Sequence, residues 1–351
     1  MKRSLPWQNN EQLNRKGETR ALLFLFGDGA SMSRKLAVVE PYLAEIHREK
    51  IRKAAEEHGF EVRVMDSPDE DRVFLQEAEV IFGQVPEVAK TSAALRWICT
   101  PFAGVDRFLA PDAFANPDAM LSNSSGAYGV TIAEHTVMML LDILRRQPEY
   151  RRIVAAHEWR RDLIVRSVKD SRITMAGTGD IGQETAKRMR TFEPDRIIGV
   201  NRNGKNPDQC FDRILTREDW ETVLPETDVL IISLPGTRET FHMVGEKQLE
   251  ALPDGAVVIN VGRGTVIDQA ALEKELMSGR LYAGLDVFEK EPLDRDDPVW
   301  DLPNLLITPH TAGNMTLAHT VNRITEMFIR DLDRYCRGEL PEHLVNRELG
   351  Y

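Results

Sequence analysis

The segment GTGDIG, residues 177–182, constrains the fold of this 351-residue chain more than any other feature. It follows a strand-like apolar run, RITMA, and opens a helix-like run, QETAKRMRTF. Glycines in this setting allow a tight turn, let phosphates approach the backbone closely and place them at a helix N-terminus. An ordinary glycine-rich turn is the alternative. The strand before and the helix after favour a dinucleotide-binding βαβ unit.

Strand-like and helix-like runs alternate along most of the chain. The first series starts with ALLFLF at Ala21 and continues with the helix-like PYLAEIHREKIRKAAEEHGF, where Leu43, Ile46, Ile51 and Ala55 fall near helical spacing. The later strand-like runs are EVRVM, EVIFG, LRWICT, RITMA, RIIGV, DVLIIS, AVVIN, YAGLDV and NLLIT. This alternation predicts an α/β fold with parallel sheets.

Turns and helix ends divide the alternating pattern. PFAGVD at 101–106 is expected to be a turn, and SNSSGAYG at 122–129 a linker before the apolar helix VTIAEHTVMMLLDILRRQ, which should end at Pro148. Asp268 and Gly279 supply a start and a stop for the helix QAALEKELMS. At about 150 residues per domain, the length predicts two domains.

Composition excludes several classes of protein. The 45 Lys and Arg residues against 56 Asp and Glu residues give a net charge of −11, which disfavours nucleic-acid binding. Cys99, Cys210 and Cys336 have no metal-ligand spacing, so we expect no metal site and no disulfide framework, and a reducing cytoplasm fits best. The first 20 residues lack an apolar segment, and the longest apolar stretch contains Asp142, so neither secretion nor a membrane span is expected.

Three polar residues each follow a strand-like run downstream of the glycine motif. They stand in VVINVGRG (Arg263), LDVFEKEP (Glu291) and LLITPHTAG (His310). A guanidinium can hold the carboxylate and carbonyl of a 2-oxo acid, an imidazole can pass a proton to the carbonyl oxygen, and a carboxylate can keep that imidazole protonated. Singly, each reads as an exposed loop residue. Together they predict hydride transfer to a keto acid.

The end of the strand RIIGV should choose between the two nicotinamide cofactors. An NAD-binding fold usually offers Asp or Glu there to the ribose hydroxyls. This chain has Asn201, followed by Arg202 and Lys205, so the acid that would repel a 2′-phosphate is replaced by cations that could hold one. A solvated basic turn that contacts nothing is the alternative. We therefore expect NADP to be favoured over NAD.

The order of motifs resembles the D-isomer-specific 2-hydroxyacid dehydrogenase family from about Ala21 to about Asn346. The segments that carry the resemblance are FAGVD, TIAEHTVMMLLDILRR, GTGDIGQETAKR, SLPGTRETFHMV, INVGRGTVID, LDVFEKEPL and LPNLLITPHTAG. The family implies two Rossmann-like α/β lobes with parallel sheets. The dinucleotide-binding lobe, 123–313, would be inserted into a flavodoxin-like substrate lobe formed by 1–122 and 314–351, with the last helix beginning near Thr316.

The resemblance also implies a role for each site residue. Arg263 would bind the substrate carboxylate and polarise its carbonyl, His310 would be the acid in reduction and the base in oxidation, and Glu291 would support the imidazolium. Backbone N–H groups of Ala103, Gly104 and Val105 would complete a carboxylate cradle in a cleft between the lobes. The expected cofactor contacts are Gly177, Thr178, Gly179, Asp180, Ile181, Gly182, Asn201, Arg202, Lys205, Ser233, Leu234, Pro235, Thr240, Val261, Gly262, Asp286 and Gly313.

Glutamate at 291 separates the chain from formate dehydrogenases of this fold, which carry glutamine there. The basic loop and DPVW before the histidine motif look most like the NADPH-dependent glyoxylate and hydroxypyruvate reductase branch. We interpret His135 as a structural helix residue and expect Trp159 and Trp300 to pack, although Trp300 could close one side of the cleft. The apolar TIAEHTVMMLLDIL helix and the resemblance suggest a homodimer.

Two other functions are alternatives to the reductase. Transcriptional corepressors share this fold, can keep the catalytic residues and act as non-catalytic NAD(H) sensors. They would be expected to carry disordered interaction tails, whereas this chain has a polar N-terminal segment of about 20 residues and a short RELGY end. A Rossmann methyltransferase would explain neither Arg263 nor the pairing of Glu291 with His310. The reductase is therefore the primary hypothesis.

Overall fold

The computed structural model describes residues 33–206 and 209–350. Contacts between Cα atoms divide the chain into two compact units. The first comprises the described residues up to 102, with 107–124 and 322–345; the second comprises 103–106, 125–321 and the residues from 346 onward. Two domains were expected from the length. The assignment of substrate to one and cofactor to the other stays a prediction.

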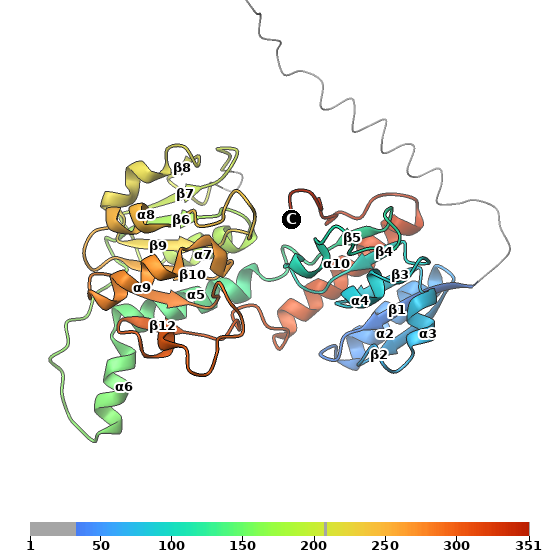
Figure 1. The fold of residues 1–351 in the computed structure, drawn as a ribbon, viewed down its shortest axis with the longest axis horizontal. Coiled ribbons are helices and arrows are strands. Elements are labelled where there is room, and N and C mark those ends of the chain that lie inside the picture. The colour runs from blue at the N-terminus through green and yellow to red at the C-terminus, as the bar shows by residue number, and fades with distance from the viewer. Residues whose placement is uncertain (1–32, 207–208, 351) are drawn as a thin grey trace, which may run out of the picture. The chain divides into compact units, whose positions relative to one another are not determined.

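The first unit is built on a five-stranded parallel sheet with strand order β2-β1-β3-β4-β5 (Figure 1). Its strands are β1 (Arg34–Val39), β2 (Phe60–Met65), β3 (Val80–Gly83), β4 (Trp97–Cys99) and β5 (Met120–Ser122). This is the flavodoxin-like order, in which the direction of strand addition reverses next to the first strand.

Three helices of the first unit connect its strands in sequence, and a fourth comes from the C-terminal part of the chain. They are α2 (Glu45–Glu57), α3 (Arg72–Glu77), α4 (Pro86–Ala89) and α10 (Ala318–Cys336), whose first four residues belong to the second unit. The expectation that Ile46 lies on the apolar face of α2 is wrong, because its side chain is 63% exposed. His47, Ile51 and Ala55 are four residues apart and form the buried face instead.

The second unit contains a seven-stranded parallel sheet with strand order β12-β11-β10-β9-β6-β7-β8. The strands are β6 (Arg172–Ala176), β7 (Arg196–Val200), β8 (Arg213–Leu215), β9 (Val229–Ile232), β10 (Val257–Asn260), β11 (Tyr282–Leu285) and β12 (Leu305–Ile307). The order matches a doubly wound Rossmann sheet with one additional strand, and its direction reverses between β6 and β9. The predicted α/β fold with two parallel sheets is confirmed.

Helices on this sheet account for the longest apolar runs. They are α5 (Gly129–Leu144), α6 (Gln147–Ala155), α7 (Asp180–Arg190), α8 (Glu246–Ala251) and α9 (Gln269–Met277). The short 3₁₀ turns of this unit are η2 (Trp220–Glu226), η3 (Gly264–Val266) and η4 (Pro298–Asp301), whereas η1 (Asp106–Phe108) belongs mostly to the first unit. α5 packs against α7, β10 and β11. Most of its apolar residues therefore build the core of their own unit, whereas Met138 is 43% exposed. As predicted, the Asp268 carboxylate accepts a hydrogen bond from the first turn of α9, and Gly279 follows that helix with a φ of +77°.

The sequence suggested that the helix α5 ends at Pro148, and this expectation is wrong. α5 stops at Leu144, Arg146 adopts a left-handed conformation with a φ of +56°, and Pro148 lies in the first turn of α6. Proline suits that position because its fixed φ is helical and the missing N–H has no partner in the first turn.

An arm formed by α6 and residues 156–165 extends from the seven-stranded sheet (Figure 1). None of the residues of α6 is buried. Trp159 is 98% exposed and Ile164 is 88% exposed, so the expectation that Trp159 packs is wrong within this chain. Trp300 is 45% exposed and donates its indole N–H to the carbonyl of Asp294.

Several other expectations differ from the structure. ALLFLF, expected to be a strand, lies outside the described residues, and the first described strand is RKLAVV. The 122–129 linker begins inside β5, and Asn123, Ser124, Ala127 and Tyr128 are buried, so it is not a solvated tether. The three cysteines are free. Within 33–206 and 209–350, each helix is either too short or too polar to cross a bilayer.

Candidate active site

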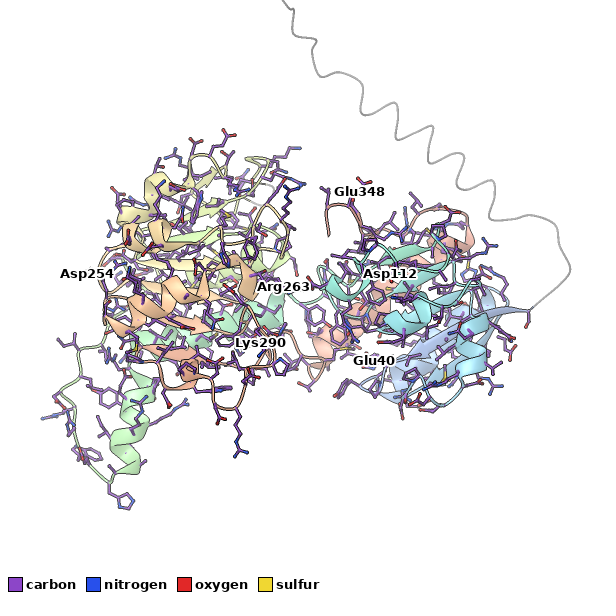
Figure 2. All side chains as sticks on the ribbon, viewed as in Figure 1. Glu40, Asp112, Asp254, Arg263, Lys290 and Glu348 are labelled. Carbon is purple, nitrogen blue, oxygen red and sulfur yellow. The ribbon has the colours of Figure 1, made fainter. Side chains whose placement is uncertain are left out.

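The predicted site residues of the second unit follow the carboxyl ends of six of its strands. The residues after β6, β7, β9, β10, β11 and β12 contribute one segment each. Because all seven strands are parallel, these segments share one edge of the sheet. Figure 2 shows Arg263 and Asp254 at opposite ends of β10, with Arg263 at the edge that carries the site.

The glycine motif occupies the turn from β6 to α7, at the point where the strand order reverses. Gly177 has a φ of +106°, and an added Cβ would lie 2.7 Å from Ser233 Oγ. A Cβ on Gly182 would collide with the carbonyl oxygen of Gly177. These two glycines are required by the protein's own packing.

Gly179 differs from the other two glycines of the motif. It is the N-cap of α7, and a Cβ built there would meet nothing within 4 Å. The open space therefore lies directly before a helix N-terminus, where backbone N–H groups favour an anion. Thr178 is the second residue of this turn, and Asp180 and Ile181 begin α7. These features fit the pyrophosphate of a dinucleotide.

Asn201 shapes the loop after β7. Its side-chain amide donates to Thr178 Oγ1 at 2.7 Å and to the carbonyl of Lys205 at 2.8 Å, and its Oδ1 accepts from the N–H groups of Asn203 and Gly204. The loop that carries Arg202 and Lys205 is thus tied to the glycine motif by one neutral amide. A carboxylate at 201 would lack the two donor hydrogens.

The segment after β9 lines the other side of the reversal point. Ser233 Oγ lies 3.3 Å from the carbonyl oxygen of Gly177, and Leu234 and Pro235 follow it. Thr240 Oγ1 lies 2.6 Å from the carbonyl of Pro235 and accepts from the N–H of Thr237. Thr240 therefore stabilises the turn that presents these residues.

Arg263 is held in a tight turn after β10. Asn260 is 1% exposed, accepts from the N–H of Gly262 and donates to the carbonyl of Arg263. The guanidinium donates to the carbonyl of Gly262 at 2.9 Å and contacts the carboxylate of Asp106 at 3.2 Å. The sequence analysis did not single out Asn260 or Asp106, although Asp106 ends the FAGVD motif.

Residues 103–106 are grouped with the second unit by their contacts. A Cβ on Gly104 would collide with the Arg263 guanidinium. Ala103 and Gly104 are partly exposed, whereas Val105 is buried at 3% exposure. Of the three predicted substrate contacts, Gly104 is thus the one beside Arg263. Only glycine fits so close to this side chain without displacing it.

His310 and Glu291 form a direct pair. His310 Nδ1 lies 2.6 Å from Glu291 Oε2, and Glu291 Oε1 accepts from the N–H of Phe288 at 2.8 Å. The His310 side chain is 52% exposed, whereas that of Glu291 is 33% exposed. With Nδ1 bonded to the carboxylate, Nε2 remains as the ring nitrogen that can exchange a proton with a ligand.

Asp286 organises the turn that carries His310. It is 1% exposed, and its carboxylate accepts from Thr308 Oγ1 at 2.6 Å and from the N–H groups of Thr311 and Ala312. Its backbone carbonyl accepts from the N–H of His310 at 2.8 Å. The carboxylate therefore bonds residues on both sides of His310. Its predicted contact with the cofactor stays a prediction.

The remaining predicted contacts lie in buried or packed positions. Val261 is 5% exposed and Gly262 would clash with Leu234 if it carried a Cβ. A Cβ on Gly313 would lie 3.2 Å from Ile132 Cδ1 on α5. Packing alone thus explains glycine at 262, whereas at 313 a Cβ would make a tight contact with a side chain; the role of both glycines toward a cofactor stays a prediction.

The sequence of this part of the chain matches a known family model. Residues 137–312 match the model of the D-isomer specific 2-hydroxyacid dehydrogenase NAD-binding domain. A glyoxylate/hydroxypyruvate reductase B of Serratia proteamaculans is 33% identical over 312 residues, which cover 86% of this chain and 94% of that protein. The chain belongs to this family. The predicted resemblance is confirmed, including its glyoxylate reductase branch.

Solved structures of the family have the same fold. A D-isomer specific 2-hydroxyacid dehydrogenase family protein from Aeromonas salmonicida superposes with a TM-score of 0.80 at 29% identity, covering 90% of this chain and 100% of that one. An NADPH-dependent glyoxylate/hydroxypyruvate reductase from Sinorhizobium meliloti, in complex with NADP and sulfate, gives 0.74 at 26% identity, covering 91% and 100%. This 2-hydroxyacid dehydrogenase is therefore an oxidoreductase of the CH–OH group with a nicotinamide cofactor.

Proposed function

We propose that this dehydrogenase reduces a small 2-oxo acid, such as glyoxylate or hydroxypyruvate, with His310 as the proton donor. The observation that carries the proposal is the 2.6 Å contact between His310 Nδ1 and Glu291 Oε2. The carboxylate accepts the Nδ1 hydrogen and fixes the orientation of the ring, which leaves Nε2–H to donate to the substrate oxygen. In the reverse reaction the neutral imidazole would take the proton back.

The other side chains would bind and orient the acid. Arg263 presents a guanidinium whose fork matches a carboxylate, and the turn at Ala103, Gly104 and Val105 would add backbone N–H groups. The Asp106 carboxylate lies 3.2 Å from the Arg263 guanidinium. A substrate carboxylate would therefore displace Asp106 from this partly exposed ion pair or bind the guanidinium together with it. The bound nicotinamide supplies or accepts the hydride at the substrate carbon.

NADP is the cofactor that the loop after β7 supports best. Asn201 replaces the acidic residue that would repel a 2′-phosphate, and its hydrogen bonds place Arg202 and Lys205 in the loop tied to the glycine motif. The S. meliloti relative is NADPH-dependent by name, which agrees with this proposal. The cofactor residues would be those of the six strand-end segments.

A homodimer in the cytoplasm completes the proposal. Most apolar side chains of α5 are buried, although Met138 is 43% exposed, so this helix offers limited apolar surface for the dimer that the sequence suggested. The arm supports one better, because Val154, Trp159 and Ile164 are each more than two-thirds exposed. A nine-residue helix without buried residues is marginal alone, and a second copy related by twofold symmetry would cover it. Three free cysteines agree with a reducing compartment.

Initial rates of nicotinamide oxidation test the proposed activity. Glyoxylate, hydroxypyruvate, pyruvate and phenylpyruvate would each be supplied with NADPH and with NADH at matched concentration. We expect turnover of the smaller acids with NADPH. Turnover with NADH alone would keep the reductase and reject the cofactor preference. Silence with all four acids would reject the proposed substrates and favour a bulkier acid or a sensor.

A further inference from the structure

A chain of three polar side chains links α5 to the turn of the proposed proton donor. His135 Nε2 lies 2.9 Å from Thr308 Oγ1, and Thr308 Oγ1 lies 2.6 Å from Asp286 Oδ1. The three residues come from α5, from the loop after β12 and from the loop after β11. The sequence predicts a structural role for His135 and gives no signal for Thr308.

The donor inventory fixes the direction of this chain. The Asp286 carboxylate is only an acceptor, so Thr308 gives its single hydroxyl proton to Asp286. The Thr308 oxygen must then accept from His135, which requires the tautomer with hydrogen on Nε2. Burial lowers the pKa of His135. The Asp286 carboxylate, 3.7 Å away, opposes that shift. A neutral His135 can make this bond.

The chain ends on a residue that clamps both sides of His310. Asp286 accepts from Thr308 before it and from the N–H groups of Thr311 and Ala312 after it. His310 itself has a φ of +53°, a left-handed conformation that is unfavourable for a non-glycine residue. Such a conformation persists only where surrounding contacts over-determine it. The clamp supplies those contacts.

We propose that His135 and Thr308 are positioning residues of this enzyme, which hold the Asp286 carboxylate so that it keeps the His310 turn in its left-handed conformation. The inference rests on the proposed role of His310. Glu291 fixes the imidazole ring at Nδ1, and the His135–Thr308–Asp286 chain fixes the backbone that carries it. Neither His135 nor Thr308 needs to touch substrate to act in this way.

Paired substitutions test the chain. Thr308→Val removes the hydroxyl without changing the side-chain shape, whereas Thr308→Ser keeps the hydroxyl. His135→Phe removes the hydrogen-bond donor, whereas His135→Gln can supply an N–H in its place. Thr136→Val is the matched control, because Thr136 is also buried on α5 but its hydroxyl bonds only the carbonyl of Ile132. kcat, KM for glyoxylate and the Kd for NADPH would be measured with each purified full chain, together with the melting temperature.

We expect Thr308→Val and His135→Phe to lower kcat by about tenfold, with KM and Kd changed less than about twofold, because Arg263 and the phosphate cradle are untouched. Thr308→Ser and His135→Gln should restore most of kcat. Normal kcat in Thr308→Val, or equal losses in the valine and serine variants, would overturn the inference. So would a loss in Thr136→Val that matches the others at equal melting temperature. A wild-type enzyme without turnover would instead reject the proposed function.

Discussion

His310 Nδ1 and Glu291 Oε2 lie 2.6 Å apart although 19 residues separate them in the chain. The two residues follow neighbouring parallel strands, β12 and β11, whose carboxyl ends the sheet places side by side. The orientation of the Glu291 carboxylate is also fixed by the backbone, because its second oxygen accepts from the N–H of Phe288. The pair is thus oriented by backbone before any ligand binds.

Replacing His310 with asparagine should remove most turnover while leaving cofactor affinity nearly intact. The proton donor is lost, and general acid catalysis is worth about 10²- to 10⁴-fold in rate. Steady-state kcat and NADPH fluorescence titration would measure the two effects. Near-normal turnover in His310→Asn would show that another group donates the proton.

Arg263→Lys should lower kcat/KM for a 2-oxo acid by about 100-fold, or about 2.7 kcal/mol, because an ammonium cannot form the planar two-bond contact with a carboxylate. Arg190→Lys serves as the control. Arg190 is exposed at the far end of α7 and pairs with Asp212. If both variants kept wild-type kcat/KM, Arg263 would not bind the substrate carboxylate.

The loop after β7 should decide the cofactor preference. Arg202→Gln combined with Lys205→Gln is expected to raise KM for NADPH by at least about tenfold, with little change for NADH, because only NADPH carries the 2′-phosphate. Arg190→Gln again controls for the loss of positive charge. An equal rise for both cofactors would mean that the two cations stabilise the loop or the shared pyrophosphate.

The arm should govern oligomeric state. Trp159→Ser with Ile164→Ser is expected to convert a dimer to a monomer in light scattering after size exclusion, since it removes two largely exposed apolar side chains from one surface. Val73→Ser, at a 70% exposed apolar residue in α3, is the control. A wild-type chain that is already monomeric would reject the dimer directly.

Acid should weaken the ion pair between Arg172 and Asp228, which lies at the end of the sheet remote from the site. Hydrogen bonds from Arg172, at 2.8–2.9 Å, lower the pKa of Asp228. A lowered carboxyl pKa adds stability that is complete above the unfolded value, near 3.9, and is lost as pH falls through the folded value. Because both side chains are about one-third exposed, Asp228→Asn should cost at most about 1 kcal/mol at pH 7.

Urea titrations between pH 2 and pH 7 would measure how much this ion pair contributes to the free energy of unfolding. The free energy of unfolding of the wild type should fall faster below pH 4 than that of Asp228→Asn. Turnover at pH 7 should be the same in both, because Arg172 and Asp228 lie at the amino ends of β6 and β9. Parallel pH curves would show that the pair adds nothing to stability.

The sequence predicted the central strands well but did not predict β1, β5 and β8. RITMA and RIIGV coincide with β6 and β7, because strands buried on both faces read as continuous apolar runs. β5 and β8 have three residues each, too few for a periodic pattern, and β1 opens with Arg34 and Lys35. Trp159 could not be placed from sequence, because an apolar side chain looks the same whether it packs in its own chain or lies on the surface.

The site was predictable where its residues carry charge after a strand, as Arg263, Glu291 and His310 do. Asn260, Thr308 and Asp106 were missed because an amide, a hydroxyl or a turn acid has common alternatives at the end of a strand. Their partners lie on other segments, so only the fold shows what they hold. Asp286 was predicted on a cofactor segment, but its bonds around the His310 turn required the three-dimensional arrangement.

The distribution of the site over six strand ends makes its assembly all-or-none. Neighbouring strands such as β6 and β9 are more than 50 residues apart in sequence, so no short fragment of the chain brings the phosphate turn, Arg263 and His310 together. A cut or an insertion in one crossover would still leave every residue of the site in the chain. Turnover therefore reports whether these six strands have paired in the sheet, and recovery of activity on refolding should lag behind recovery of helical signal.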